Sequence, residues 1–371
     1  MRVLLTGGGT GGHVYPGLTL WRYILQMHPE AEVLYIGSNK GLEREIVAHA
    51  GLPFVTVPAT GLKRQISLDA FRTLWTVWRG YRAARRLINN FRPDVAVGTG
   101  GYVALPVIWA ASRMGIPTVV WEANARPGLT NQLLSYRAKA VAVSFIDTQS
   151  LFSHARKVTF TGHPRGSEVR GVNPDAVEQV RKDYGIPQGS RLVVIFAGSR
   201  GAATINQVVK QMWTELARRT NWYVVHATGE DHFQQIQAES KDCPKNVRLT
   251  PFIHNMPALM SLADVLVTRA GGATLAEICS FALPSILIPS PYVTANHQEE
   301  NARRLVERGA AKLILEADLS APRLLRELQL ILETSQGSVL ADNARRLAVP
   351  DAVHTLYQLV MEICDCETGT Q

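Results

Sequence analysis

Four glycine-rich segments carry residues that could bind an anionic ligand. Each follows a short apolar run, and they span residues 7–13, 98–102, 198–201 and 269–274. Glycine lets the backbone approach a ligand closely, and the N–H groups at a helix N-terminus bind phosphate or an oxyanion. A tight turn alone would explain one such loop. Four of them favour a shared binding edge for a phosphate-bearing ligand.

The first loop matches the dinucleotide-binding fingerprint by spacing, through Gly7, Gly9 and Gly12. A nicotinamide cofactor also needs an acidic residue at the end of the second strand, where it binds the ribose hydroxyls. Glu32 lies at about the right distance but begins that strand, which ends in Gly37. We therefore expect no cofactor of this class.

Three side chains near these loops could take part in chemistry. His13 ends the first loop, and its unperturbed pKa near neutrality suits a general base, although it could instead orient the loop. Glu122 closes a strand and is the second candidate base. Glu277 lies in the first turns of the helix after the fourth loop, where it could accept ribose hydroxyls, complement the helix dipole, or both.

The elements that must position these residues alternate between apolar strands and helical stretches. The first half predicts strands at 3–6, 32–36, 53–57, 95–98 and 118–122, and the second at 191–197, 223–227, 247–251, 265–268, 285–288 and 311–315. This alternation indicates an α/β fold with parallel sheets covered by helices. Pro16 is placed to start the first helix, and Asn206 to cap the helix after the third loop.

The restart of the pattern predicts two doubly wound, Rossmann-like domains. We expect the first at residues 1–162 and the second at 163–345, with an apolar helix at 350–365 that joins the first. A chain of 371 residues, 46% hydrophobic, is long enough for two such cores. The four cysteines are expected to be free thiols.

The charge of the chain favours anionic partners. The net charge is +8, and residues 61–90 contain seven basic side chains and one acidic one, interleaved with apolar and aromatic residues. This segment predicts a helix that contacts an anionic bilayer; a core helix with a solvated face is the alternative. The candidate contacts are Lys63, Arg64, Leu68, Phe71, Arg72, Trp75, Trp78 and Arg79. We recognise no nucleic-acid-binding module and expect no nucleic-acid partner.

No apolar run approaches the roughly 20 residues of a membrane span. The N-terminal apolar run reaches Gly7 too soon for a signal peptide. The expected location is therefore the cytoplasm, with peripheral membrane contact.

Taken together and in order, the motifs resemble those of the MurG family of sugar transferases. They read Gly8-Gly9-Thr10-Gly11-Gly12-His13, Gly100-Gly101-Tyr102, Glu122-Ala123-Asn124, Gly128-Leu129-Thr130-Asn131, Gly198-Ser199-x-Gly201-Ala202 and Arg269-x-Gly271-x-x-Thr274-x-x-Glu277. The resemblance runs from Met1 to about Tyr357. It implies the GT-B architecture, in which two domains face a cleft, with the acceptor on the first and the donor mainly on the second.

The resemblance also implies the reaction. It is an inverting transfer of N-acetylglucosamine from UDP-N-acetylglucosamine to the muramyl sugar of undecaprenyl-linked lipid I. Because the sequence contains no Asp-x-Asp motif of the metal-dependent sugar transferases, we expect the transfer to be metal-independent. The product, lipid II, serves peptidoglycan synthesis at the cytoplasmic face of the plasma membrane, where other cell-wall synthesis proteins are possible partners. Three alternatives stay open: sugar transfer to diacylglycerol, UDP-N-acetylglucosamine 2-epimerisation, and UDP-sugar binding without catalysis.

Site residues follow from the resemblance motif by motif. Thr10, Gly11 and Gly12 are expected to face the donor sugar and diphosphate, Asn124 and Gln298 the sugar, Ser199 the diphosphate, Ile253 the uracil, Gly271, Gly272, Ala273 and Thr274 the phosphates, and Glu277 the ribose. The chain departs from the family twice. His297 replaces the first of two usual glutamines, and Arg165, the candidate for the diphosphate, stands one position early.

Overall fold

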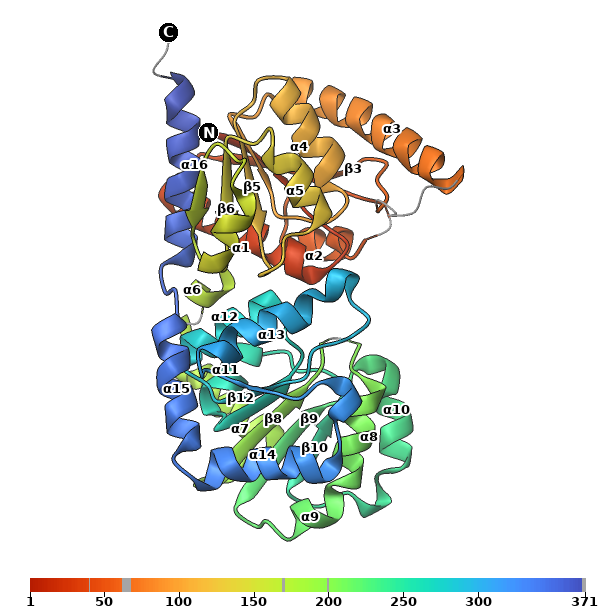
Figure 1. Ribbon diagram of the computed structural model, residues 1–371, viewed down its shortest axis with the longest axis vertical. Coiled ribbons are helices and arrows are strands. Elements are labelled where there is room, and N and C mark those ends of the chain that lie inside the picture. The colour runs from red at the N-terminus through yellow and green to blue at the C-terminus, as the bar shows by residue number, and fades with distance from the viewer. Residues whose placement is uncertain (40, 62–67, 169–170, 199, 369–371) are drawn as a thin grey trace. The chain divides into compact units, whose positions relative to one another are not determined.

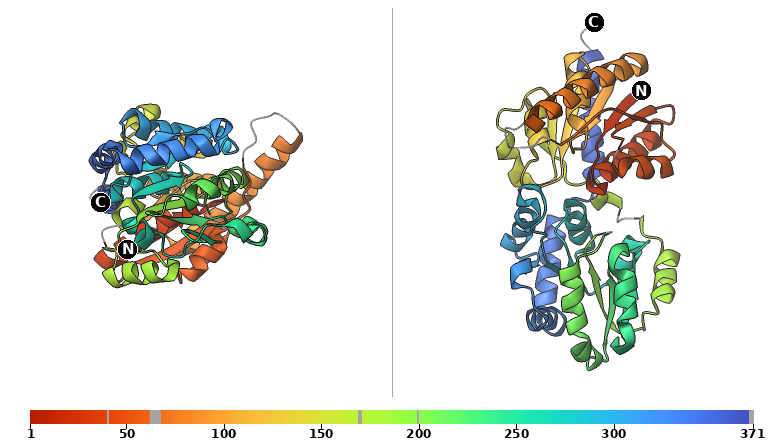
Figure 2. Two further views of the ribbon diagram at one scale, coloured as in Figure 1. Left: turned by 90° about the horizontal axis from the view of Figure 1, so that it is seen from below. Right: turned by 90° about the vertical axis from the view of Figure 1, so that its right-hand side faces the viewer.

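The computed structural model describes residues 1–39, 41–61, 68–168, 171–198 and 200–368, with only the backbone at 68–71 and 365–368. Contacts divide the chain into two compact units. Unit 1 comprises Met1–Ser167 and Asp351–Gln371, and unit 2 comprises Glu168–Pro350. The sequence-based division after residue 162 lies close to this one. Each unit is a parallel sheet covered by helices on both faces (Figures 1 and 2), so the predicted α/β fold is confirmed.

The described part of unit 1 forms a seven-stranded parallel sheet in the order β3-β2-β1-β4-β5-β6-β7. Its strands are β1 (Arg2–Thr6), β2 (Glu32–Gly37), β3 (Phe54–Thr56), β4 (Val95–Gly98), β5 (Thr118–Glu122), β6 (Ala140–Val143) and β7 (Val158–Phe160). The strand order reverses between β1 and β4. Open α/β sheets bind ligands at such a switch point, beyond the carboxyl ends of the strands.

The helices of unit 1 connect these strands and cover the sheet. They are α1 (Gly11–Met27), α2 (Glu43–His49), α3 (Leu68–Phe91), α4 (Ala104–Arg113), α5 (Leu129–Ser135), the 3₁₀ helix η1 (Ile146–Phe152) and α16 (Ala352–Thr368), while α6 (Arg165–Glu168) begins the passage to unit 2. Two apolar clusters fill the space between helices and sheet, one on each face.

The C-terminal helix α16 returns to unit 1 and packs against α1 (Figure 1). Tyr23 and His354 form a hydrogen bond of 2.8 Å, and His28 and Tyr357 one of 2.9 Å. Leu356, Leu359, Val360 and Ile363 add their side chains to the core. The end of the chain thereby completes the first sheet's covering layer.

The described part of unit 2 repeats the pattern with six parallel strands in the order β10-β9-β8-β11-β12-β13. The strands are β8 (Arg191–Phe196), β9 (Trp222–Ala227), β10 (Val247–Thr250), β11 (Val265–Thr268), β12 (Ser285–Leu287) and β13 (Lys312–Leu313). Its switch point lies between β8 and β11, each of which is followed by a glycine loop.

Helices cover both faces of this second sheet. They are α7 (Pro174–Tyr184), α8 (Ala203–Gln211), α9 (Trp213–Ala217), α10 (Glu230–Ala238), α11 (Met256–Leu262), α12 (Gly272–Phe281), α13 (His297–Glu307), α14 (Ala321–Glu333) and α15 (Gln336–Leu347). The 3₁₀ helices η3 (Ser240–Asp242), η4 (Thr294–Asn296) and η5 (Glu316–Asp318) lie between them.

The structure corrects several local expectations. β6 and β7 were not predicted. Pro16 lies inside α1 rather than at its start, because the helix already begins at Gly11. Asn206 does not cap α8, whose N-cap is Ala202. Its side chain instead donates to the carbonyl of Thr228 at 2.9 Å and contacts the buried His226 ring, which ties α8 to β9.

Helix α3 packs one face against α4 and leaves the other exposed. Ala84 and Ile88 are buried, and Gly80 lies so close to the carbonyl of Pro58 that an added Cβ would stand 2.1 Å from it. The opposite face carries exposed aromatic and basic side chains. Among the helices that the structure describes, none is long and apolar enough to cross a bilayer.

Candidate active site

The loops after β1 and β4 are locked together at the switch point of unit 1. The Gly8 N–H donates to the carbonyl of Gly100 at 3.3 Å, and the Thr99 hydroxyl donates to the carbonyl of His13 at 2.5 Å. Gly101 has a φ of +80°, and a Cβ there would stand 2.1 Å from the Gly8 carbonyl oxygen. Only glycine fits this close approach, which explains its place in the second loop.

His13 lies in the first turn of α1 and is half-buried. Its Nδ1 lies 3.1 Å from the carbonyl oxygen of Gly8 and 3.2 Å from the Thr10 hydroxyl. A carbonyl only accepts, so Nδ1 carries the proton in the neutral ring, and Nε2 carries the lone pair. The loop therefore fixes the tautomer that a general base needs.

A buried carboxylate supports the same loop. Glu43 begins α2, is fully buried, and accepts hydrogen bonds from Gly9 N–H at 3.1 Å, Ser38 N–H at 2.9 Å and the Ser38 hydroxyl at 2.6 Å. Burial would raise the pKa of this carboxyl, but the hydrogen bonds from Ser38 and Gly9 hold it below its ordinary value. The Ser38 hydroxyl also contacts the Tyr102 hydroxyl at 3.0 Å.

Tyr102 borders a cavity of about 620 Å³ in unit 1. Its other lining residues are Ser38, Asn39, Val57, Pro58, Ala59, Thr60, Gly61, Arg72, Thr73 and Thr76. The cavity thus combines hydroxyl groups and an amide with one guanidinium, and it lies beside the first glycine loop. This chemistry suits a polar ligand with negative charge.

Glu122, the second candidate base, is saturated with hydrogen bonds. Its oxygens accept from the Asn124 N–H at 3.0 Å, the Asn124 amide at 3.2 Å, the Gly128 N–H at 3.0 Å and the Asn131 amide at 2.8 Å. The side chain is only 2% exposed. This arrangement favours a role in holding the loop between β5 and α5 over proton transfer.

Arg165 lies against the start of α1. Its guanidinium is 5.8 Å from the ring centre of Tyr15, which is on the same first turns as Thr10, Gly11 and Gly12. The structure thus brings Arg165 to the first glycine loop despite its shifted position in the sequence.

Unit 2 contains a cavity of about 550 Å³ at its own switch point. It is lined by Phe196, Ala197, Gly198, Gly201, Ala202, Ala203, Thr204, His232, Thr268, Arg269, Gly271, Thr274, Ser290, Tyr292, Val293, Gln298 and Glu316. The N-termini of α8 and α12 both open on it, and neither has a side-chain cap. Two helix N-termini with uncapped N–H groups favour a phosphate-bearing ligand.

An ion pair braces one wall of this cavity. Arg269 contacts Glu316 at 2.5 Å and donates to the carbonyl of Ile288 at 3.0 Å. Glu316 also accepts from the Thr204 hydroxyl at 2.9 Å. The two charges of the pair offset each other, so the pair positions the wall and leaves the helix N-termini as the source of positive potential.

The expected donor contacts in unit 2 divide into four groups. Gly271, Thr274 and Gln298 line the cavity, and the Gln298 carbonyl oxygen accepts from the Ser290 N–H at 2.9 Å. Gly272 and Ala273 lie in the first turn of α12 but are not lining residues, while Glu277 and Ile253 are buried behind the surface, 6% and 3% exposed. Ser199 lies outside the described residues.

The expected membrane contacts are described for part of their set. On α3, Trp75 is 60% exposed and Trp78 44%, and the two rings stack 4.9 Å apart. Arg72 and Arg79 are exposed on the same helix, and Arg82 lies over the Trp78 ring. Lys63 and Arg64 lie outside the described residues, as do the side chains of Leu68 and Phe71.

Two histidines in the cores are held neutral. Burial, with Arg165 nearby, lowers the pKa of His163 to about 3, and burial lowers that of His226 to about 4. His163 Nδ1 accepts from the Arg165 N–H at 3.2 Å, and its ring packs edge-on against Trp121. This neutral histidine anchors the backbone of Arg165.

Sequence reasoning missed Glu43, Thr204 and Glu316. Glu43 acts mainly through backbone N–H groups, which leave no motif in the sequence. The glycines near it were the only indication, because a Cβ at Gly8 would collide with its carboxylate. Thr204 and Glu316 are far apart in the chain, and no spacing rule links them. In the described part of the chain, no group of three or more His, Cys, Asp or Glu side chains could hold a metal.

Comparison with known proteins identifies both units. Residues 3–143 match the glycosyltransferase family 28 N-terminal domain, and residues 192–356 match the glycosyltransferase family 28 C-terminal domain. The chain is 44% identical over 368 residues to the UDP-N-acetylglucosamine–N-acetylmuramyl-(pentapeptide) pyrophosphoryl-undecaprenol N-acetylglucosamine transferase of Bacillus cytotoxicus, covering 98% of this chain and 99% of that protein. The Bacillus licheniformis protein of the same name is 42% identical over 366 residues, again with 98% and 99% coverage.

Solved structures agree with this assignment. MurG from Acinetobacter baumannii superposes with a TM-score of 0.76 at 26% sequence identity. The superposition covers 97% of this chain and 99% of the Acinetobacter chain. The UDP-GlcNAc 2-epimerase of Neisseria meningitidis shares the fold alone, with a TM-score of 0.69 at 16% identity over 98% of this chain and 100% of the epimerase. The chain therefore belongs to glycosyltransferase family 28 and, within it, to the MurG family.

Proposed function

We infer that this enzyme transfers N-acetylglucosamine from UDP-N-acetylglucosamine to the muramyl sugar of pyrophosphoryl-undecaprenol-linked lipid I, forming lipid II for peptidoglycan synthesis. The observation that carries this inference is the 44% identity to a transferase of that name over 98% of the chain. The glycine motifs at both switch points fit the reaction because it needs a site for a nucleotide diphosphate.

Unit 2 is the proposed donor-binding unit. The diphosphate would accept hydrogen bonds from the N–H groups that begin α8 and α12, at Ala203, Thr204 and Gly271 to Thr274. Gln298 would hold hydroxyls of the sugar, and Ser199 belongs to the same loop by sequence. Ile253 would contact the uracil and Glu277 the ribose. Because Ile253 is buried, a small opening of the loop before α11 would be needed to expose it.

Unit 1 is the proposed acceptor-binding unit. The size of the cavity beside Tyr102, its hydroxyl groups and the guanidinium of Arg72 favour it as the acceptor site. A muramyl-peptide diphosphate is polar and anionic, so it fits this lining better than an apolar diacylglycerol does. Asn124, which Glu122 holds through two hydrogen bonds, would contact the sugar of the donor.

His13 is the proposed general base. The acceptor hydroxyl would give its proton to Nε2 while its oxygen forms a bond to C1 of the sugar. The bond between C1 and the phosphate oxygen breaks on the opposite side, UDP leaves with the electron pair, and the anomeric configuration inverts. The hydrogen bond between Nδ1 and Gly8 supports this role because it keeps the lone pair on Nε2.

We propose that the departing diphosphate is stabilised without a metal ion. Two helix N-termini supply positive potential in unit 2, and Arg165 beside Tyr15 is the candidate cation in unit 1. Transfer should therefore continue in excess EDTA. Activity that is lost in EDTA and restored by magnesium would contradict this part of the proposal.

The proposed location is the cytoplasmic face of the plasma membrane, with peripheral attachment. Its support is the exposed Trp75–Trp78 stack among basic residues of α3, since aromatic and cationic side chains together bind anionic bilayer surfaces. Other proteins of cell-wall synthesis would then meet the enzyme at this membrane.

The experiment is a transfer assay with labelled UDP-N-acetylglucosamine, in which a short-chain lipid I analogue competes with diacylglycerol. We expect a labelled disaccharide lipid from the lipid I analogue alone. Label in diacylglycerol would assign a glycolipid synthase instead. Conversion of the donor to the UDP-linked 2-epimer of its sugar, with no acceptor present and no net release of UDP, would assign an epimerase.

A further inference from the structure

The loop between β12 and α13 (Figure 1) presents an aromatic side chain at the cavity of unit 2. Tyr292 lies in this loop and is one of the residues that line the cavity. It is 87% exposed, more than any other large apolar residue in the described part of the chain. A phenol ring left in water at the wall of a cavity offers an apolar surface that a ligand can cover.

Hydrogen bonds hold the two ends of this loop together. The Ser290 N–H donates to the side-chain carbonyl oxygen of Gln298 at 2.9 Å, and the Tyr292 N–H donates to the Ser290 hydroxyl oxygen at 3.4 Å. Gln298, which is expected to contact the sugar of the donor, thus lies at the neck of the loop that carries Tyr292. Both residues line the same cavity, so a ligand that contacts one is placed to contact the other.

The backbone that follows Tyr292 is held in an uncommon conformation. Ala295 and Asn296 have φ values of 57° and 53°, in the left-handed region that favours glycine. The Asn296 amide donates to the Glu299 carboxylate at 2.7 Å and helps to fix this turn. Strain of this kind persists only where the surrounding structure fixes it, and it is common in segments that clamp ligands. The loop is therefore a defined support for Tyr292.

His297 is used by the loop itself. Its Nδ1 lies 2.9 Å from the carbonyl oxygen of Thr294. A carbonyl only accepts, so Nδ1 carries the proton in the neutral ring and holds the turn before α13. Of His297 and Gln298, only Gln298 lines the cavity. This wall thus offers one amide for the hydroxyl groups of a ligand, and Tyr292 beside it offers an apolar face.

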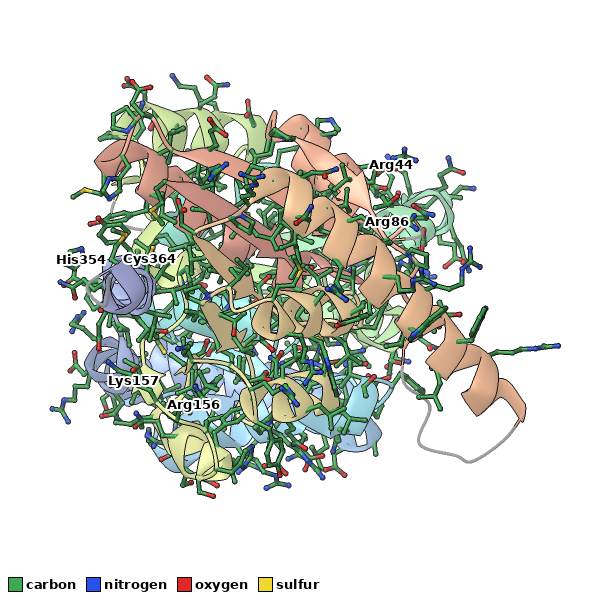
Figure 3. All side chains as sticks on the ribbon, turned by 90° about the horizontal axis from the view of Figure 1, so that it is seen from above. Arg44, Arg86, Arg156, Lys157, His354 and Cys364 are labelled. Carbon is green, nitrogen blue, oxygen red and sulfur yellow. The ribbon has the colours of Figure 1, made fainter. Side chains whose placement is uncertain are left out.

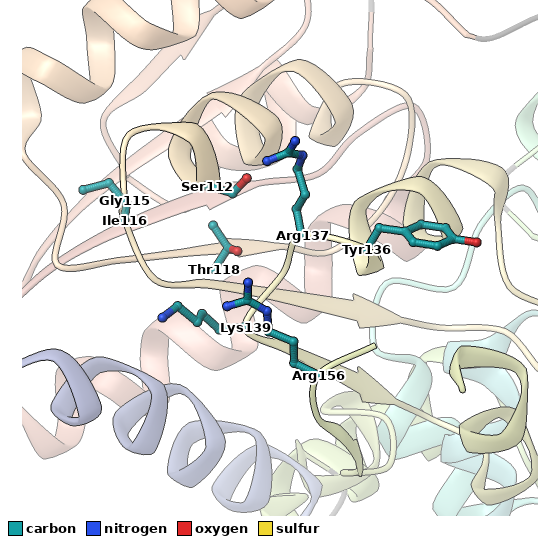
Figure 4. A pocket seen from close by; sticks show the side chains of 8 residues that line it. All are labelled: Ser112, Gly115, Ile116, Thr118, Tyr136, Arg137, Lys139 and Arg156. Carbon is teal, nitrogen blue, oxygen red and sulfur yellow. The ribbon is translucent and has the colours of Figure 1, made fainter. Parts of the chain in front are cut away.

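The composition of the loop suits an uncharged group. Residues 289–296 contain no charged side chain. The cavity at the amino ends of β5, β6 and β7, by contrast, is lined by Arg137, Lys139 and Arg156 (Figure 4), and the face of unit 1 in Figure 3 carries further basic side chains such as Arg86. Cationic linings attract phosphate groups, whereas a sugar ring is bound through hydrogen bonds and through contact with its C–H groups.

N-acetylglucosamine has an apolar surface that fits an aromatic ring. Its hydroxyl and acetamido groups lie around the edge of the pyranose ring, so C–H groups cover the two faces. The face of a phenol ring is electron-rich and attracts such polarised C–H groups, in addition to the apolar area that the contact buries.

We propose that Tyr292 is a specificity-determining residue of the donor site, whose ring packs against one face of the donor sugar. Gln298 would bind hydroxyl groups of the same sugar, and the N-terminus of α12 would hold the diphosphate. The inference rests on the proposed donor site in unit 2. It adds a contact by which the enzyme distinguishes the nucleotide sugar from the free nucleotide.

The test is isothermal titration calorimetry of the full-length protein with UDP-N-acetylglucosamine and with UDP, without an acceptor. Tyr292→Ala should raise the dissociation constant of UDP-N-acetylglucosamine by about 10-fold and that of UDP by less than about 2-fold, because UDP lacks the sugar. Tyr292→Phe keeps the ring and should bind both ligands like the wild type. Val339→Ala, at an exposed position of α15, is the control and should change neither constant.

Three results would overturn the inference. Equal weakening of both ligands by Tyr292→Ala would mean that the ring contacts the nucleotide. Unchanged binding of both ligands would mean that the ring does not touch the donor. A loss in Tyr292→Phe as large as that in Tyr292→Ala would assign the effect to a hydrogen bond of the hydroxyl group and not to packing of the ring.

Failure of the sugar-transfer proposal would look different. The titrations use no acceptor, so each of the three results above leaves that proposal standing. A wild type that binds neither UDP nor UDP-N-acetylglucosamine would overturn both. Because Tyr292 is exposed, its variants should keep the melting temperature of the wild type, which thermal denaturation checks.

Discussion

His13 depends on its loop for its chemistry. The Gly8 carbonyl oxygen, 3.1 Å from Nδ1, selects one tautomer, and the Thr99 hydroxyl holds the backbone carbonyl of the same residue. A substitution at His13 therefore tests proton transfer only if the loop is preserved. Glu122 offers the contrast, because its oxygens are occupied by four donors in the loop that follows β5.

His13→Ala should lower kcat by about 100- to 10,000-fold, the usual contribution of a general base, and leave the KM for the donor nearly unchanged. Glu122→Gln should instead lower the melting temperature, because the loop loses acceptors. Steady-state kinetics and thermal denaturation of both variants separate the two roles. A loss of only a few-fold for His13→Ala would remove it as the base.

The neutral buried histidines make stability depend on pH in a definite direction. The pKa values are lowered from 6.5 to about 3 for His163 and about 4 for His226, so the unfolded chain binds protons that the folded chain does not. Their contribution is complete above pH 6.5 and is lost as the pH falls below it. His163→Gln should reduce this slope by up to about 1.4 kcal/mol per pH unit in urea denaturation between neutral and mildly acidic pH. An unchanged slope would mean that His163 is not held neutral.

At the scale of elements, the glycine loops could be predicted from the sequence, whereas the side chains that hold them in place could not. Each of these loops could be recognised in the sequence because it needs glycine directly after an apolar strand. Strands β6 (Ala140–Val143) and β7 (Val158–Phe160) were not predicted, although β6 is as long and as apolar as β4. The prediction that Asn206 caps α8 was wrong, because the helix begins three residues earlier and its N-cap, Ala202, has no side-chain hydrogen bond.

Glu43 holds the first glycine loop in place, so its substitution should affect both stability and activity. Its carboxylate joins the end of β2 to the first glycine loop through Ser38 and Gly9. Glu43→Gln turns one accepting oxygen into a donor that faces other donors, which should cost about 1–3 kcal/mol of unfolding free energy. We also expect a lower kcat, measured by the transfer assay at a temperature where the variant is folded. Leu42→Gln, exposed one residue earlier, is the matched control and should change neither quantity.

The exposed face of α3 can be tested without disturbing the fold. Trp75→Ser combined with Trp78→Ser removes the aromatic stack, and both side chains are largely exposed. Association with anionic vesicles should weaken by about 10-fold or more, while the melting temperature changes little. Tyr292→Ser, at an 87% exposed position in unit 2, is the control for vesicle binding. If the α3 variant binds vesicles like the wild type, α3 is an ordinary solvated helix.

At the scale of the whole molecule, both units repeat one arrangement of strands and glycine loops. Each sheet reverses its strand order beside its first strand, and each reversal carries paired glycine loops. The sequence alone indicated this duplication, because the motif order restarts at β8. Contacts such as that of Arg269 with Glu316 join distant segments of the sequence, so only the folded chain reveals them.

The proposed reaction is an inverting transfer onto the muramyl sugar of lipid I. The most direct measurement is NMR of the product formed from UDP-N-acetylglucosamine, whose sugar is α-linked, and a short-chain lipid I analogue. We expect a disaccharide with a β linkage to the muramyl residue. An α linkage, or a donor sugar that is epimerised without any transfer, would contradict it.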